Sequence, residues 1–260
     1  MKGDFDEDRP DDPPYRSPEE IDASELRSAL WNLHFLGDDM FMRMQAFNLS
    51  IVDPFLMNLE SDVLQKLIDE ERTPVPEATF LSAQSQMWIF AAYELLRTWR
   101  QRCRDIIKWS ENSGLQLKLA ELEKDMGYPH VARQMRADQL RRVIAEPSTI
   151  AAVQDQLRVT HIPFARMEAV RVSIAKHEVM GRRNAVALRP GYARINQWCG
   201  SLDYELENGR YSMGYISRRD IADEIRALSQ PGPLPDDEML KEFDDFMRGV
   251  EPPSFDDEPV

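Results

Sequence analysis

An arginine and a histidine, Arg171 and His177, lie six residues apart in the second half of this 260-residue chain. Arginine keeps its charge and offers a planar fork that matches phosphate geometry. Histidine titrates near neutral pH and can act as a general acid or base. Lys176, Arg182 and Arg183 add positive charge close by in the sequence. These residue types are suited to phosphate binding at Arg171 and to proton transfer at His177.

Whether the side chains of Arg171 and His177 can meet depends on where the predicted helix that carries them ends. On a straight helix Arg171 and His177 would point about 120° apart. They could still converge on one ligand if the helix ends near Lys176, or if two copies meet at a dimer interface. Alternatively, both are surface residues near a helix C-terminus, where the helix dipole favours cations.

The run from Arg171 to His177 resembles the Arg-x(4–6)-His motif of HEPN domains, which are helical bundles common in toxin–antitoxin, CRISPR and phage-defence systems. Ile174-Ala175, just before the histidine, is similar to the apolar pair often found there. The resemblance implies a homodimer whose paired motifs form a metal-independent endoribonuclease site. In such a site His177 would act on the ribose 2′-hydroxyl or the leaving oxygen. Arg171 would bind the scissile phosphate.

The resemblance covers roughly residues 24–180 and has one departure. A long predicted helix containing Tyr93-Glu94-Leu95 is in keeping with HEPN bundles. Val172 follows the motif arginine, whereas active members of the family usually carry a polar residue there, often Asn or Asp. Other HEPN-like proteins are inactive binding modules, so the resemblance implies either binding or cleavage of RNA.

Other patterns that would carry chemistry are absent from the sequence. There is no GxxxxGK[ST] or GxGxxG phosphate loop, no HExxH and no Cys-x-x-Cys. His34 and Asp38 would lie one turn apart on a helix, but such pairs often arise by chance. We therefore predict no metal site and no cofactor. Cys103 has basic neighbours that could lower its pKa, yet a small buried residue is the interpretation we favour.

The charge is strongly polarised along the chain. The formal net charge is −14, but residues 97–194 carry 19 basic and 10 acidic side chains, a net of +9, and most of these bases are arginines. Residues 21–96 carry a net of −8. The basic segment predicts a face that binds a polyanion such as RNA. Alternatively, its arginines pair with the acidic first third of the same fold.

Both ends of the chain are acidic and rich in proline. Residues 1–20 carry a net charge of −5 and residues 231–260 a net of −8. Such segments bury too little apolar surface to offset chain entropy, so both are predicted to be disordered tails. The tails could bind a basic protein partner. They could also fold back on the basic face and compete with RNA.

The hydrophobic spacing between the tails predicts a mainly α protein. Residues 21–180 are expected to form a helical bundle, with helices starting at Ser24 and at Asp53-Pro54. Residues 181–230 are expected to form a loop, a β-hairpin turning at Asn208-Gly209, and a final helix. Ser217 and Asp220 have the spacing of a capping box for that helix.

No secretory signal begins the chain, and no run approaches the ~18 apolar residues of a membrane span. The sequence therefore predicts a cytoplasmic protein without membrane contact. The leading hypothesis is an HEPN-like protein that binds or cleaves RNA. The alternative is a non-catalytic helical adaptor or regulator that acts through protein–protein contacts.

Overall fold

A computed structural model describes residues 15–180, 186–189, 191–209, 211–230 and 232–249. This part of the chain is mainly helical and carries one three-stranded antiparallel sheet of order β1-β2-β3, which confirms the predicted fold class. In chain order the elements are the 3-10 helix η1 (Pro18–Glu20), α1 (Glu25–Trp31), α2 (Met40–Glu70), α3 (Val75–Glu111), α4 (Gly114–Leu122), α5 (Val131–Ala145), α6 (Thr149–Val159), α7 (His161–Lys176), β1 (Ala193–Ile195), β2 (Leu202–Glu207), β3 (Ser212–Ser217), α8 (Arg218–Ala227) and α9 (Asp237–Arg248).

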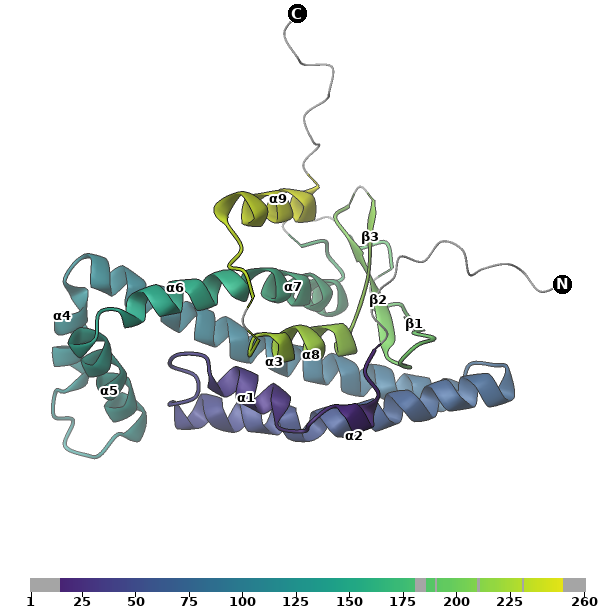
Figure 1. Cartoon of the computed structure of the whole chain (residues 1–260), viewed down its shortest axis with the longest axis horizontal. Coiled ribbons are helices and arrows are strands. Elements are labelled where there is room, and N and C mark those ends of the chain that lie inside the picture. Colours follow the sequence, from purple (N-terminus) through teal and green to yellow (C-terminus); the bar gives the residue numbers. More distant parts are fainter. Residues whose placement is uncertain (1–14, 181–185, 190, 210, 231, 250–260) are drawn as a thin grey trace, which may run out of the picture.

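Two long antiparallel helices, α2 and α3, run the length of the molecule (Figure 1). Helix α7 packs along α3, while α8 packs on α1 and follows directly from the sheet. Buried side chains of β2, β3 and α8, including Tyr204, Ile216 and Ile221, belong to the same hydrophobic core as those of α1, α2 and α3. Segment 181–230 is thus built into the helical core where the structure describes it.

The predicted helix start at Ser24 is confirmed, because α1 begins at Glu25 with Ser24 as its N-cap, but the long helix expected after Ser24 is divided into α1 and α2. The chain breaks between α1 and α2, where Phe35 has a left-handed φ of 66° and Asp39 accepts hydrogen bonds from two α2 amides at 3.0 Å. The predicted start at Asp53-Pro54 is wrong, because α2 continues through Pro54. Proline inside a helix lacks an N–H and weakens it. Tertiary contacts of Asp53 offset that cost.

The break before α2 also changes which of its residues are buried. Spacing predicts an apolar core stripe containing Phe41, Met44 and Phe47, but these side chains are exposed. Met42 and Ala46 face the core instead. Because α2 starts independently of α1, its rotation is set by its own buried contacts and not by the periodicity that runs across both helices.

A buried ion network joins α2 to α8. Arg218 is fully buried, and its guanidinium binds Glu60 through two hydrogen bonds of 2.7 and 2.8 Å and also pairs with Asp53. Arg226 pairs with the second oxygen of Asp53. Burial acts to lower the pKa of Arg218, but Glu60 and Asp53 more than offset it and hold that pKa above its ordinary value. Buried charges are tolerated in this way only when they are paired.

The sheet is held against the same network. Ser201 donates a 2.9 Å hydrogen bond to Glu60, and the neighbouring Gly200 adopts a φ of 77°. A Cβ atom on Gly200 would lie 1.9 Å from the carbonyl oxygen of Glu60, so no other residue fits without movement of the backbone. The chain after β1 therefore lies directly on α2.

The hairpin and the capping box are confirmed. Strands β2 and β3 pair antiparallel, and Asn208 between them accepts from the amide of Tyr211 at 3.3 Å. At the start of α8, Asp220 accepts from the amide of Ser217 at 2.7 Å, while the Ser217 hydroxyl accepts from the amide of Asp220 at 3.1 Å. Both features depend on local chemistry.

Part of the acidic C-terminal segment, which the sequence predicts as a mobile tail, forms helix α9. Its amphipathic spacing buries Met247 and packs Phe243 against the core. Asp237 forms an ion pair of 2.7 Å with Arg158, which fixes the start of the helix on α6. Composition averaged over the segment conceals this helical periodicity. The outer parts of both predicted tails, 1–14 and 250–260, lie outside the described residues.

Replacing Arg218 with methionine should destabilise the fold by about 3–5 kcal/mol, because Glu60 and Asp53 would stay buried without their main counter-charge. Urea unfolding followed by circular dichroism measures the free energy of unfolding. Arg72→Met is the matched control, since Arg72 pairs with Glu70 on the surface. It should change stability by less than about 1 kcal/mol. Equal losses in the two variants would contradict a central role for the network.

Candidate functional site

Arg171 projects from α7 onto α3. Its guanidinium carbon lies 5.1 Å from the centre of the Tyr93 ring, a cation–π distance. Its terminal nitrogen lies 3.8 Å from a carboxylate oxygen of Glu94, a loose ion pair. Arg171 is half-buried, so the motif arginine is held against the bundle and does not extend into solvent.

Tyr93 is the residue that orders this part of the site. Its ring stacks on Phe164 with centroids 5.3 Å apart, and its hydroxyl donates a 3.0 Å hydrogen bond to Glu168. Burial, followed by the charge of Glu168, raises the pKa of Tyr93 to about 12. The phenol therefore stays protonated at neutral pH and continues to donate to Glu168. Glu168 and Arg171 are three residues apart on α7 and so share one face of that helix.

His177 follows the last residue of α7. It adopts the left-handed conformation with a φ of 57°, and its amide donates to the carbonyl of Ser173 at 3.1 Å. The carbonyl of His177 accepts from the amide of Ala187 at 2.9 Å, which ties down the returning chain. The side chains of His177 and Lys176 are both exposed. Helix α7 thus ends at Lys176, the end that convergence of Arg171 and His177 would need.

The structure does not bring the two motif side chains together. Arg171 contacts α3, whereas His177 is exposed beyond the end of α7, and no hydrogen bond, ion pair or ring contact joins the two within the described residues. Lys176 lies beside His177 in sequence and shares its exposure. Arg182 and Arg183, predicted to bind nucleic acid, lie outside the described residues. Within a single chain, the side chains of Arg171 and His177 therefore lie in different places.

Most arginines of the basic segment are paired with acidic side chains from elsewhere in the chain. Besides Arg97 and Arg171, which both pair with Glu94, the pairs are Arg102 with Asp39, Arg142 with Asp38, Arg158 with Asp237, Arg166 with Glu224, Arg189 with Glu205 and Arg194 with Asp203. Among the described residues of the basic segment 97–194, the exposed bases without an acidic partner are Arg104, Lys108, Lys124 and Lys176. Intramolecular pairing thus uses much of the predicted polyanion-binding charge, and it draws on both the acidic first third and the C-terminal third.

The remaining candidates from the sequence are engaged in structural contacts. His34 bonds to Gln156 at 3.0 Å, Asp38 pairs with Arg142, and Asp39 caps α2. Across the described ranges, no group of three or more His, Cys, Asp or Glu side chains is placed to hold a metal ion. Cys103 is buried, and burial raises the pKa of its thiol to about 12, so it is a poor nucleophile at neutral pH.

Tyr93, Glu94 and Glu168 are the residues whose role sequence reasoning missed. Tyr93 and Glu94 lie in the long helix α3, but nothing local in the sequence connects them to Arg171, which is 77 positions from Glu94. The three-residue spacing of Glu168 and Arg171 on one helix face is the only signal in the sequence that could have suggested a partner for the arginine.

Comparison with models of protein families, with curated proteins and with solved structures gives no match to this chain. The function must therefore be argued from the residues of the site. Within the described residues, none of the helices is both long and apolar enough to cross a membrane.

A half-buried carboxylate on α8, Glu224, pairs with Arg166 of α7 and gives a pH test of this arrangement. Burial raises the pKa of Glu224 from 4.5 to about 7, against the opposing effect of its ion pair with Arg166. The folded state therefore binds this proton more tightly than the unfolded state. Stability from this group is full below the unfolded pKa and is lost as the pH rises through the folded pKa.

Raising the pH from about 4.5 to about 8 should lower the free energy of unfolding of the wild type by up to about 3 kcal/mol through Glu224. Glu224→Gln should abolish this loss, because glutamine does not titrate. Urea unfolding of wild type and variant at both pH values measures the difference. Glu71→Gln, an exposed carboxylate at the end of α2, is the control and should keep the wild-type slope. An unchanged slope for Glu224→Gln would show that this carboxylate titrates normally.

Proposed function

We propose that this chain is an HEPN-like protein that binds RNA where α7 ends, and that His177 allows it to cleave RNA without a metal ion. The observation that carries the proposal is the exposed His177, placed just beyond the helix that holds Arg171. A histidine in that position is free to meet a ribose hydroxyl. The exposed Lys176 beside it supplies charge for the RNA backbone.

The roles of the two motif residues follow from their chemistry. A neutral imidazole at His177 accepts the proton of the 2′-hydroxyl, and the imidazolium later returns a proton to the leaving oxygen. Arg171 binds the phosphate and stabilises the charge that develops on it. Its ion pair with Glu94 is loose at 3.8 Å, so a phosphate can replace the carboxylate as its partner. Cleavage requires this rearrangement because the two side chains are apart within one chain.

Cleavage of a mixed RNA panel in EDTA tests the catalytic role. His177→Ala should lower the cleavage rate by about 10²–10⁴-fold, the usual contribution of general acid–base catalysis. His130→Ala is the matched control, because His130 is an exposed histidine at the start of α5, and it should cut as wild type does. Equal cutting by all three proteins would indicate a contaminating nuclease. No cutting by wild type would overturn the catalytic part of the proposal.

A second candidate function, a non-catalytic adaptor or regulator, is favoured by a different observation. The basic segment is largely neutralised within the fold, and acidic α9 is docked on it through Arg158 and His161, whose ring lies 2.7 Å from Asp244. A helix that carries an acidic face and occupies a basic surface excludes other anions from it. In this second function the chain binds a protein partner through its acidic segments.

Removal of residues 231–260 separates the two candidates. If α9 competes with RNA for the basic face, the truncated chain should bind RNA more tightly at low salt, and the gain should shrink at high salt. Fluorescence anisotropy with a labelled single-stranded RNA measures the affinity. Asp237→Asn combined with Asp244→Asn keeps the apolar face of α9 and should shift affinity in the same direction. Absence of RNA binding in every variant would favour the adaptor.

A further inference from the structure

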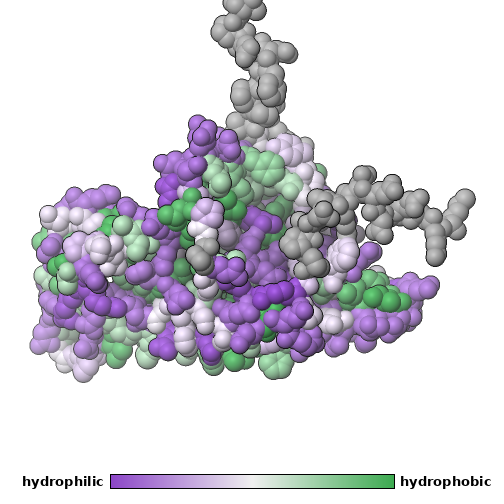
Figure 2. Space-filling model, in the orientation of Figure 1, coloured by the Kyte–Doolittle hydropathy of each residue, from purple (hydrophilic) through white to green (hydrophobic). Residues whose placement is uncertain are grey.

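An apolar stripe lies on the outer face of α2. Seven large apolar side chains between Met40 and Phe55 are exposed, and Phe55 is the most exposed of them at 71%. The stripe consists of Met40, Phe41, Met44, Phe47, Ile51, Val52 and Phe55. Spacings of three and four residues place most of them on one side of the helix. Figure 2 shows hydrophobic residues at the lower edge of the molecule, where α2 runs in Figure 1.

The stripe cannot turn inward, because the opposite face of α2 is fixed. Asp53 and Glu60 lie on that inner face and are locked to Arg218 in the buried ion network. Rotation of α2 to bury the stripe would expose or unpair these charges. The stripe is therefore a fixed outer surface of the part of the chain that the structure describes.

The exposed apolar area of the stripe is close to the area that one partner contributes to a protein–protein interface. With about 150–250 Å² for a fully exposed aromatic side chain, the stripe presents roughly 700 Å². The largest apolar patch on a typical monomer is about 300–600 Å². Each partner in a stable complex of standard size contributes about 800 Å². Pairing the stripe with an equal surface would meet that requirement.

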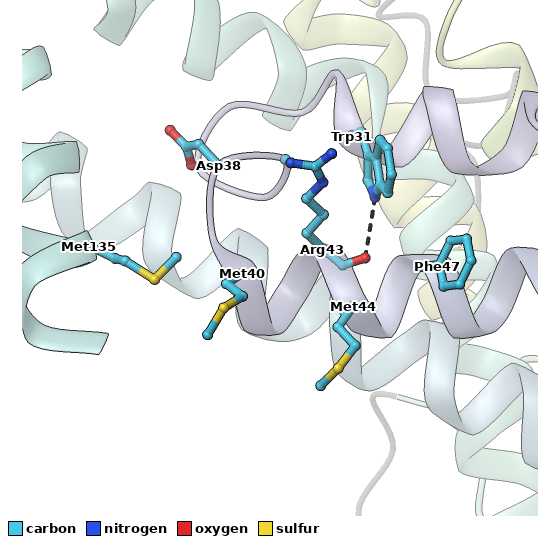
Figure 3. Close-up of a pocket in the computed structure, with 8 residues that line it drawn as sticks. Trp31, Asp38, Met40, Arg43, Met44, Phe47 and Met135 are labelled. Carbon is cyan, nitrogen blue, oxygen red and sulfur yellow. Dashed lines mark hydrogen bonds between the residues drawn. The ribbon is translucent and has the colours of Figure 1, made fainter. Parts of the chain in front are cut away.

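A hollow of about 430 Å³ extends the apolar surface at the N-terminal end of the stripe. Met40, Met44 and Phe47 line it from α2, and Trp31 and Met135 line it from α1 and α5 (Figure 3). In Figure 3 the side chain of Met135 reaches toward Met40 across the opening. Flexible methionine side chains adapt to an incoming partner, and the hollow has room for a large apolar side chain.

The charge pattern indicates what the partner is. Among the exposed residues of α2 from Met40 to Asn58, Arg43 is the only charged one. Its guanidinium stacks on Trp31, 4.2 Å from the ring centroid, and so is turned to the side of the stripe. A surface that meets a copy of itself must avoid opposing like charges. A neutral stripe satisfies that condition, whereas a surface for an acidic or basic partner would carry complementary charge.

We propose that the stripe is the interface of a homodimer in which α2 of one copy packs antiparallel on α2 of another. Alignment of the whole stripe with itself centres the pair between Phe47 and Asn48, so that Met40 of one copy faces Phe55 of the other. Antiparallel packing also keeps the two Arg43 side chains apart, since a parallel pair would place them side by side. This proposal does not rest on RNA binding, because α2 and α7 lie on opposite sides of α3 (Figure 1).

Light scattering coupled to size exclusion, on the full-length protein over a range of concentrations, tests the interface. Wild type should be a dimer, and Met44→Glu and Ile51→Glu should each be monomers that remain folded, because both side chains are exposed in the single chain. Leu117→Glu is the matched control: Leu117 is 76% exposed on α4, away from the stripe, and this variant should stay dimeric. A monomeric wild type, or stripe variants that stay dimeric, would overturn the proposal.

Single added cysteines, in a chain whose half-buried Cys199 is replaced with serine, test the antiparallel register. Asn48→Cys should form a disulfide-linked dimer on mild oxidation, because the two copies of position 48 lie about one residue apart along the paired helices. Met40→Cys should not, because its two copies would be separated by about 22 Å at 1.5 Å per residue. Cross-linking of both variants would indicate parallel packing, and cross-linking of neither would exclude the α2 interface. Lys176→Cys cross-links would instead indicate a dimer through α7.

The two proposals fail separately. His177→Ala should stay dimeric, and Met44→Glu should retain any RNA affinity of the single chain, because the mutated residues are on different helices with α3 between them. Loss of dimerisation with unchanged RNA binding supports an interface that is independent of the RNA site. Loss of both properties in Met44→Glu would overturn that independence.

Discussion

The buried pairing of Arg218 with Asp53 and Glu60 is the constraint on which the rest of the structure depends. It joins the middle of α2 to the first residue of α8, although these residues are more than 150 positions apart. Ser201 and Gly200 bring the sheet to the same place. Such a network contributes little net stability if its partners are compared with a packed apolar core, but it permits only one arrangement of the helices. The rotation of α2, and hence its outward apolar stripe, follows from that arrangement.

Charge separation along the chain becomes charge pairing in the fold. Arginines of the central segment bind carboxylates of the loop before α2, of the sheet, of α8 and of α9. Acidic side chains near the end of the chain therefore have basic partners within the fold, in addition to any on another molecule. Lys176 and His177 at the end of α7 remain exposed, which is why the proposed RNA contact lies there and not along the whole basic segment.

Two surfaces of different chemistry result, on opposite sides of α3. One is the end of α7, with its exposed histidine and the ordered Arg171–Tyr93 contact. The other is the neutral stripe on α2. An elongated pair of helices separates them, so association through one surface leaves the other accessible (Figure 1). A chain organised in this way can dimerise without covering its candidate site.

The sequence by itself determined the features that depend on neighbouring residues. The helical class, the hairpin at Asn208-Gly209 and the capping box at Ser217 follow from local backbone preferences and short-range hydrogen bonds. It also identified His177 as a group able to transfer protons.

Only the tertiary structure decided which face of α2 is buried, that Pro54 is tolerated within a helix, and that Arg171 lies on Tyr93 instead of beside His177. The physical reason is the same in each case. Burial and ion pairing between distant segments are worth several kcal/mol, whereas the local preferences that they override are each worth about 1–3 kcal/mol. Distant partners such as Arg218 for Asp53 cannot be read from spacing along the chain.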